Sequence, residues 1–232
     1  MFAFRDKIML MKKSLATFFG LSAAVILACV VWIGWEFYSY HRDMRAYKDE
    51  VALASRDGAT PEQVQQAEGK DETEPADPLK GYVVAADAPR AIYIDKLGVR
   101  ARVLEMGLNP DRSIQAPINI FDAGWYNGSA KPGEKGAAVI DGHASGPSRE
   151  GLFAYVETLA PGDRVMVERG DGVRLEYEVV EKKNYHYENV DMTEVMRVKG
   201  GDEGLNLITC TGNWVKDRKT FDTRAIIFTR RV

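Results

Sequence analysis

Short apolar runs, each ended by turn-forming residues, fill the chain from residue 90 to the C-terminus. Seven of them have the length and the β-branched or aromatic content of strands: AIYI, RVLEM, AAVI, RVMVE, LEYEVV, LNLI and AIIF. Glycine, proline, asparagine and aspartate separate the runs. Many short strands at this spacing predict a mainly β domain that closes, or nearly closes, into a barrel. Within it we expect two short helical segments, around residues 151–159 and 192–198.

The N-terminal pattern is different, because residues 15–35 form one run of 21 residues without a charge. As a helix this run would be about 31 Å long, enough to cross the hydrocarbon core of a bilayer. Four basic residues stand within the first 13 positions. The positive-inside rule therefore places residues 1–14 in the cytoplasm. We expect a single-pass transmembrane anchor over residues 15–38, with the rest of the chain outside the cell membrane.

Two other interpretations of this segment stay open, a cleaved signal peptide and a buried core helix. The stretch Ile26-Leu27-Ala28-Cys29 loosely resembles a lipoprotein cleavage box. After Cys29, however, the chain continues as the apolar VVWIGW, where a mature secreted protein would turn polar. An uncleaved anchor is therefore the expected outcome.

Residues 39–88 are polar and charged. Thr60 and Pro61 suit the cap and the first turn of a helix. The following GKDETEPADP, residues 69–78, lacks the apolar residues that a folded segment needs. We expect residues 39–88 to form an extracytoplasmic stalk, partly helical and partly disordered, and residues 89–232 to form the catalytic domain.

Composition adds one useful constraint. The net charge of -3 and the 45% hydrophobic content indicate an ordinary globular domain and give no sign of nucleic-acid binding. The chain has two cysteines, Cys29 and Cys210. Because Cys29 lies in the predicted membrane segment, Cys210 would be an unpaired thiol in an oxidising compartment. A catalytic thiol would explain it.

The stretch LNLITCTGNWVKDRKTFDTRAIIF carries the most informative chemistry. It predicts an antiparallel hairpin, with Cys210 at the end of its first strand and Arg224 at the start of its second. His143 stands where the AAVI strand gives way to a loop. A thiol, an imidazole and a guanidinium form a set suited to acyl transfer, because they supply a nucleophile, a proton carrier and an oxyanion partner. The alternative is an inert, buried cysteine and a structural histidine.

Three separated blocks, WYNGSAKPGEKGAAVIDGH, LFAYVETLAPGDRVMVERGDGVRLEYEV and LNLITC followed by the arginine strand, together resemble the sortases, which are membrane-anchored cysteine transpeptidases. The likeness covers residues 89–232, and the first block is most similar to class F and then class E. The resemblance implies an eight-stranded sortase barrel in which His143, Cys210 and Arg224 are the catalytic residues. The chain departs from the family's Thr-Leu-x-Thr-Cys pattern at Asn206.

The resemblance also implies a function. We expect cleavage of a Leu-Pro-x-Thr-Gly-like sorting motif in secreted proteins and transfer of the acyl group to an amine, such as a cell-wall precursor. Alternatives are a pilin-polymerising sortase that uses a pilin lysine, a hydrolytic cysteine peptidase, and an inactive membrane-tethered binding barrel. No cofactor or metal site is predicted, because no suitable spacing of histidine and cysteine and no phosphate-binding loop occurs.

Several other residues have an ordinary interpretation. Asp141 is expected to form a turn or lie on the surface, although support of His143 stays open. Trp125 is interpreted as barrel packing, His186 as a surface residue and Arg218 as a solvated loop charge. Calcium binding stays open for the carboxylates of Glu178, Glu181, Glu188 and Asp191.

Overall fold

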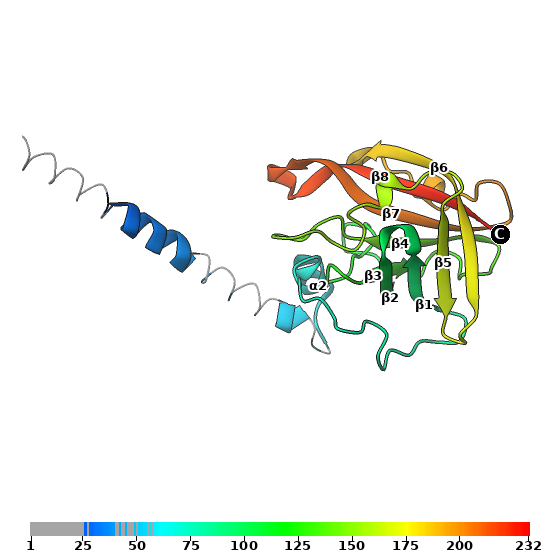
Figure 1. Cartoon of the computed structure of the whole chain (residues 1–232), viewed down its shortest axis with the longest axis horizontal. Coiled ribbons are helices and arrows are strands. Elements are labelled where there is room, and N and C mark those ends of the chain that lie inside the picture. The colour runs from blue at the N-terminus through cyan, green and yellow to red at the C-terminus, as the bar shows by residue number, and fades with distance from the viewer. Residues whose placement is uncertain are drawn as a thin grey trace, which may run out of the picture. The chain divides into compact units, whose positions relative to one another are not determined.

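The computed structural model describes residues 26, 28–39, 42, 45, 49, 51–54, 56 and 58–232 (Figure 1). The chain divides into two compact units, Met1–Asp49 and Glu50–Val232. The first unit contains a helix over residues 28–39, and half of the predicted anchor at residues 15–38, namely residues 15–25 and 27, lies outside the described residues. Among the helices that are described, none has both the length and the apolar character that crossing a bilayer requires.

The second unit is an eight-stranded closed barrel, which confirms the predicted architecture. Around the barrel the order is β1-β2-β3-β4-β7-β8-β6-β5. Adjacent strands are antiparallel except for the pairs β2–β3 and β4–β7. The strands are β1 (Pro89–Ile94), β2 (Val99–Met106), β3 (Ala123–Tyr126), β4 (Gly136–Gly142), β5 (Arg164–Arg169), β6 (Arg174–His186), β7 (Glu203–Val215) and β8 (Thr220–Arg231).

Helices are short and lie between the strands or ahead of them. This unit contains the α-helices α2 (Pro61–Ala67) and α3 (Met192–Val195), and 3-10 turns span Asp95–Leu97, Val156–Thr158, Tyr187–Asn189 and Lys216–Arg218. Thr60 caps α2 as predicted, accepting a hydrogen bond from the backbone of Gln63 in a capping box. The segment expected to be helical around residues 151–159 is reduced to one 3-10 turn.

Alternating apolar positions point into the barrel and fill it. Tyr177, Phe153, Ile140 and Leu207 are among the fully buried side chains of this main core. Residues one position away along the same strands face outward, and a second apolar cluster forms there around Val139, Ile226, Phe228 and Val195. The outer face of β4, β7 and β8 is therefore also lined by packed side chains.

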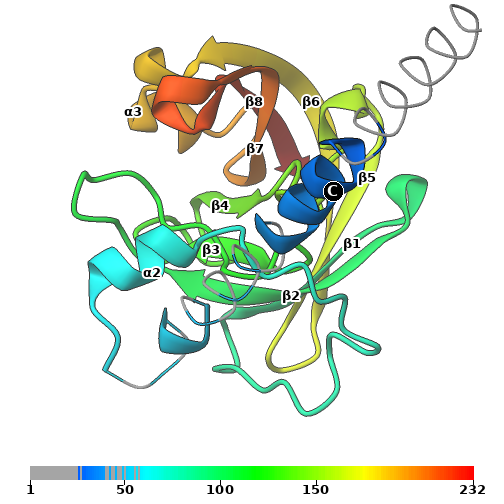
Figure 2. The same cartoon turned by 90° about the vertical axis from the view of Figure 1, so that its left-hand side faces the viewer.

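The segment after α2 differs from the sequence-based expectation. Residues 69–78 were predicted to lack folded structure, but Asp71 pairs with Asn119 in a parallel β-bridge. Its amide donates to Ile118 O at 3.0 Å, and its carbonyl accepts from Ile120 N at 2.9 Å. We call residues 68–82 the belt, since they run along the outside of the barrel from α2, which lies near β3 (Figure 2).

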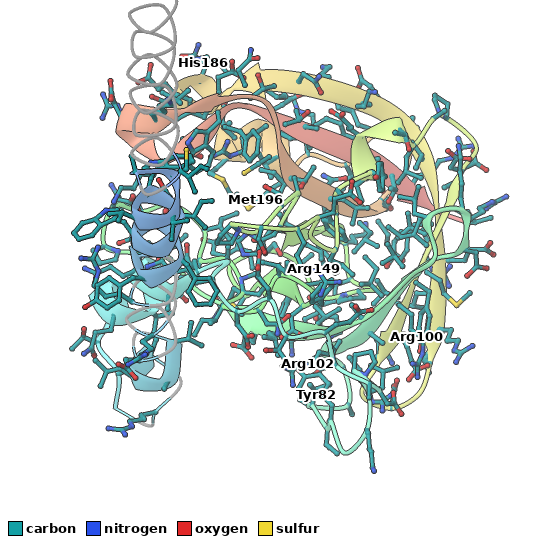
Figure 3. The ribbon with its side chains drawn as sticks, turned by 60° about the vertical axis from the view of Figure 1, so that its left-hand side comes forward. Tyr82, Arg100, Arg102, Arg149, His186 and Met196 are labelled. Atoms are coloured by element: carbon teal, nitrogen blue, oxygen red, sulfur yellow. The ribbon has the colours of Figure 1, made fainter. Side chains whose placement is uncertain are left out.

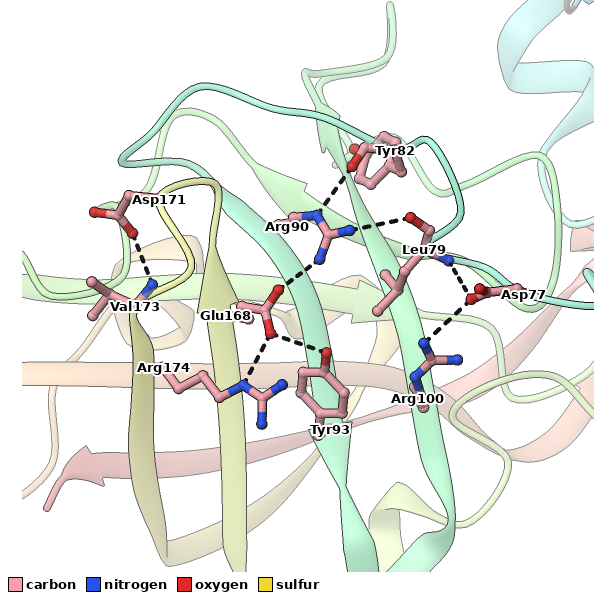
Figure 4. A network of polar contacts seen from close by, with 10 residues as sticks. All are labelled: Asp77, Leu79, Tyr82, Arg90, Tyr93, Arg100, Glu168, Asp171, Val173 and Arg174. Atoms are coloured by element: carbon pink, nitrogen blue, oxygen red, sulfur yellow. Dashed lines mark hydrogen bonds and ion pairs between the residues drawn. The ribbon is translucent and has the colours of Figure 1, made fainter.

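Charged side chains hold the far part of the belt. Arg90 donates to the carbonyls of Leu79 and Tyr82 and pairs with Glu168 at 2.6 Å, while Arg100 pairs with Asp77 at 3.2 Å (Figure 4). On the same side of the molecule, the guanidinium of Arg102 lies 5.7 Å from the ring centroid of Tyr82 (Figure 3). These contacts are electrostatic and local, so a polar, proline-rich sequence can still be ordered. The prediction of disorder for this part of the stalk was wrong.

Candidate active site

Cys210 and Arg224 face each other across neighbouring strands on the outer face of the barrel. The register pairs Cys210 with Arg224 and pairs Arg224 in turn with Tyr185 of β6. This confirms that the hairpin brings the cysteine and the arginine together. The predicted strand limits were too short, because β7 continues past the cysteine to Val215 and β8 begins at Thr220.

Cys210 is paired with β8 on one side but lies beyond the last residue pair between β7 and β4 on the other. β4 ends at Gly142, and its last pairing with β7 joins Asp141 to Ile208, two residues before the cysteine. The Thr209 hydroxyl donates to the carbonyl of Gly142 at 2.9 Å and so ties the two strands together at this point. His143 follows directly after Gly142, as predicted for a residue at a strand end. The histidine therefore lies on the β4 side of the cysteine, and the arginine on its β8 side.

The imidazole of His143 is held from two directions. Its Nε2 lies 2.7 Å from the carbonyl oxygen of Pro117, which also accepts the amide of Gly69 at 2.9 Å. A carbonyl can only accept, so Nε2 carries the proton and Nδ1 is the acceptor of the neutral ring. Gly69 has a positive φ of 68°, and a Cβ placed there would be 2.9 Å from ring atom Cε1. The belt thus covers one face of the histidine.

Burial sets the charge states of the thiol and the imidazole. It raises the pKa of Cys210, with Arg224 acting in the opposite direction and Asp141 adding to the rise. It lowers the pKa of His143, against the opposing effect of the hydrogen bond to Pro117. Near pH 7 the resting pair is therefore a neutral thiol and a neutral imidazole.

Arg224 is oriented by the hairpin turn. Its Nη1 donates to the carbonyls of Phe221 at 2.9 Å and Thr223 at 3.2 Å, and its Nη2 donates to Thr220 Oγ1 at 2.8 Å. A guanidinium has five N–H donors. Within the part of the chain that the structure describes, these three bonds leave donors over for a ligand beside Cys210.

Asp141 does not form a triad with His143. The described residues contain no hydrogen bond between them, and the imidazole instead contacts Pro117. The Asp141 Oδ1 atom is buried and has no hydrogen-bond partner among the described residues. Burial, and then the nearby carboxylate of Glu68, raise the pKa of Asp141 well above the usual value. The expectation of a turn or surface carboxylate was wrong, because Asp141 belongs to β4.

Asn206, the departure from the sortase cysteine block, has a structural role. It is fully buried, and its side-chain amide donates to the carbonyls of Val195 at 2.7 Å and Arg197 at 2.9 Å. Its Oδ1 accepts from the backbone of Thr229 at 3.3 Å. The asparagine therefore fixes α3 and the chain after it against β7 and β8.

Comparison with protein families gives a match to the sortase domain over residues 92–232. The chain belongs to the sortase family. It is therefore a cysteine transpeptidase, and the family match includes all three predicted catalytic positions. A comparison with curated proteins gives no match.

Among solved structures, a pilus-related sortase C of Group B Streptococcus is similar, with a TM-score of 0.50 and 18% identity over 83% of this chain and 90% of that one. A Clostridium perfringens sortase D5 transpeptidase has a TM-score of 0.46 and 21% identity, over 66% and 84% of the two chains. Sortase C-1 of Actinomyces oris has a TM-score of 0.48 and 25% identity, over 68% and 84%.

The other residues singled out in the sequence lie where they were expected. Trp125 is buried in the main core and its Nε1 donates to Ala130 O at 3.1 Å, so it packs this sortase's barrel. Arg218 ends the exposed 3-10 turn of the hairpin. His186 lies at the edge of the molecule (Figure 3), and its side chain is 48% exposed.

The acids considered for calcium are partly engaged in ion pairs. Glu178 pairs with Arg164 and Arg230, and Glu181 with Lys183 and Lys199. Over the described residues, no group of three or more His, Cys, Asp or Glu side chains is arranged to hold a metal ion.

Gly69 and Pro117 were missed as site residues. Their contacts with the histidine use a backbone carbonyl and the absence of a side chain, and neither leaves a pattern in the sequence. The glycine after the predicted α2 helix could only have suggested a helix end. Only the fold shows that this end lies on the histidine.

Proposed function

We propose that this sortase forms a thioester at Cys210, with Arg224 as the oxyanion partner and His143 as the proton carrier. The observation that carries the proposal is the arrangement of one thiol between a guanidinium on β8 and an imidazole after β4. The guanidinium and the imidazole then lie on opposite sides of the thiol, so one can contact the oxyanion while the other transfers protons.

The reaction starts from the minor charged form of the pair. Transfer of the thiol proton to Nδ1 of His143 gives a thiolate and an imidazolium, and the thiolate attacks the substrate carbonyl. Arg224 stabilises the resulting oxyanion. The imidazolium protonates the departing amine as the C–N bond breaks, leaving the acyl group on sulfur. An incoming amine then attacks the thioester, loses a proton to the imidazole, and releases the Cys210 thiol.

We assign the acyl donor to secreted proteins with a Leu-Pro-x-Thr-Gly-like sorting motif, as the family resemblance implies. The second apolar cluster supports this assignment, because Tyr185, Val190 and Met192 are partly exposed and pack on the outer face next to the Arg224 side of the cysteine. An apolar Leu-Pro segment fits such a surface. The acceptor is a primary amine, of a cell-wall precursor or, in the alternative, of a pilin lysine.

One incubation separates the transpeptidase from its alternatives. The soluble domain is mixed with a sorting peptide and either a wall-type stem peptide or a lysine-containing pilin peptide, and products are identified by mass. An amide product is expected, and the better acceptor distinguishes wall attachment from pilin polymerisation. Hydrolysed peptide alone would indicate a peptidase, whereas unchanged peptide would indicate an inactive binding barrel.

We also propose that residues 1–14 lie in the cytoplasm, that residues 15–38 anchor the chain and that the barrel lies outside the membrane. The basic N-terminus and the 21 uncharged residues support this topology. Protease added to intact, wall-stripped cells should digest the barrel. Because the belt is paired with the barrel, residues 69–78 should not be the first site of cleavage. Protection of the barrel until cells are lysed would contradict the topology.

A further inference from the structure

The β4 side of the active site contains a carboxyl group that the mechanism above does not use. Asp141 lies two residues before His143, and its strand partner Ile208 lies two residues before Cys210. Residues two apart on a strand share a face. Ile208 packs on the outer apolar cluster, whereas Ile140 and Leu207 face the barrel interior. Asp141 therefore faces outward, in the row of residues directly next to the catalytic row.

The fold makes room for this carboxyl group. Gly124 of β3 pairs with Asp141, and a Cβ at Gly124 would collide with Asp141 Oδ1 and crowd Met106 Cγ and Pro117 Cδ. The carboxyl group thus occupies the space that a β3 side chain would fill, in the neighbourhood of Pro117, whose carbonyl contacts His143. Glycine inside a strand often marks such a close approach.

The described residues supply no hydrogen-bond donor to one oxygen of Asp141. Oδ1 of Asp141 is buried without a donor, which is unfavourable for a polar atom. The charged group that acts on Asp141 is a second carboxylate, Glu68, and no cation among the described residues acts on it. Arg224, on the other side of Cys210, acts on the thiol instead. The cysteine therefore stands between a cationic side and an acidic side.

We propose that Asp141 binds the amino group of the acyl acceptor and presents it to the thioester on Cys210. This inference rests on the proposed function and adds to it the place where the second substrate binds. Acceptor amines are ammonium ions near neutral pH, since a lysine side chain has a pKa of about 10.4. The ammonium ion supplies the cation that the Asp141 carboxylate lacks, at the part of this half-buried side chain that stays accessible next to the buried Oδ1.

Proton balance follows directly. The protonated Asp141 carboxyl group releases its proton to solvent as the ammonium ion binds, and then takes one proton from that ion to give a neutral amine. The amine nitrogen attacks the thioester carbon, the C–S bond breaks, and the second amine proton passes through His143 to sulfur. The products are the amide, the Cys210 thiol and a protonated Asp141, as at the start.

The test compares a charged and an uncharged nucleophile on the same acyl-enzyme. The protein is loaded with a sorting peptide, and the ratio of aminolysis to hydrolysis is measured with Nα-acetyl-lysine amide, which is cationic, and with hydroxylamine, which is largely uncharged at neutral pH. For Asp141→Asn we expect the ratio for the lysine amine to fall about tenfold, the scale of a hydrogen bond to a charged group, while the hydroxylamine ratio stays within about twofold.

Controls make each outcome decisive. Asp217→Asn removes a negative charge from the exposed hairpin turn and should leave both ratios unchanged, whereas Asp141→Glu should retain the preference for the cationic amine. An equal fall for both nucleophiles, or no fall for either, overturns the proposal. Failure of the unaltered protein to form any acyl-enzyme would instead refute the proposed function. If Asp141→Asn does not fold, Asp141→Ala takes its place, and a lysine ratio that does not fall selectively in that variant also overturns the proposal.

Discussion

The two sides of Cys210 differ in how their polar groups are satisfied. On the β8 side, Arg224 donates to two carbonyls and a hydroxyl and stays partly exposed. On the β4 side, His143 Nε2 contacts the carbonyl of Pro117, and Asp141 Oδ1 has no partner among the described residues. The arginine side is preorganised by satisfied bonds, whereas the acid side retains an unsatisfied one. This difference fits an arginine that is already oriented before substrate binds and a carboxyl group that gains a partner only when a ligand binds.

The largest loss of activity should come from a mutation on the Arg224 side of Cys210. Arg224→Ala removes the group that faces the developing oxyanion, and we expect kcat/KM to fall on the order of a hundredfold or more, the usual scale for one lost oxyanion donor. Arg218→Ala, in the exposed hairpin turn, serves as the control and should change the rate little. A larger loss for Arg218→Ala would mean that the wrong arginine has been assigned.

The charge states of the central pair predict the pH profile. The reactive form needs a protonated His143 and an ionised Cys210. Burial lowers the pKa of His143 and raises the pKa of Cys210. Between these two values the fraction of reactive form is constant. The kcat/KM profile should thus have a plateau with one limb on each side, and kcat/KM should fall about tenfold per pH unit along each limb. The acid limb should begin below pH 6.5 and the alkaline limb above pH 9.0. Limbs inside that range would contradict the assigned shifts.

The raised thiol pKa also affects the alkylation of Cys210. Because burial raises the thiol pKa, Cys210 of an active enzyme should react slowly with small alkylating agents at neutral pH. Slow alkylation alone therefore cannot favour the inactive binding barrel. Thioester formation is the informative measurement.

The belt is tested by a pair of glycine substitutions. Gly69→Ala places a methyl group against the His143 ring, and a displacement of a fraction of an ångström should lower kcat about tenfold. Gly81→Ala is the matched control, since Gly81 has a similar φ of 71° in the same belt, but a Cβ added there would have no neighbouring atom within 4 Å. Steady-state rates and thermal melts are compared for both. Equal losses of rate would assign the effect to backbone strain.

The smallest expected effect concerns the stability of the acid side. The folded-state pKa of Asp141 is raised by burial and then by Glu68, so the group stabilises the fold fully only below about pH 4, where it is protonated in both states. As pH rises toward the folded pKa, the unfolded chain ionises and stability is lost. Asparagine cannot ionise, so the melting temperature of Asp141→Asn should gain on the unaltered protein between about pH 4 and pH 7. A constant difference would contradict a raised pKa.

The barrel could be predicted because short apolar runs bounded by turn-forming residues are a local signal. Seven of the eight strands follow it, and β3 was missed because its AGWY sequence is short and contains Gly124. The pairing of Cys210 with Arg224 could be predicted too, since a hairpin has few registers. The belt could not, because backbone hydrogen bonds to residues 117–120 place no demand on side chains. The burial of Asp141 depends on Pro117 and Gly124, which come from other parts of the chain.

The central claim is that the acyl group is carried on Cys210, and the mass of the acyl-enzyme tests it most directly. The full-length protein in detergent is incubated with a sorting-peptide library without amine, trapped at low pH, and analysed as intact protein and as proteolytic fragments. We expect a single adduct on the fragment that contains Cys210, retained in Cys29→Ala and absent from Cys210→Ala. An adduct that persists in Cys210→Ala, or one that maps to another residue, would contradict the account.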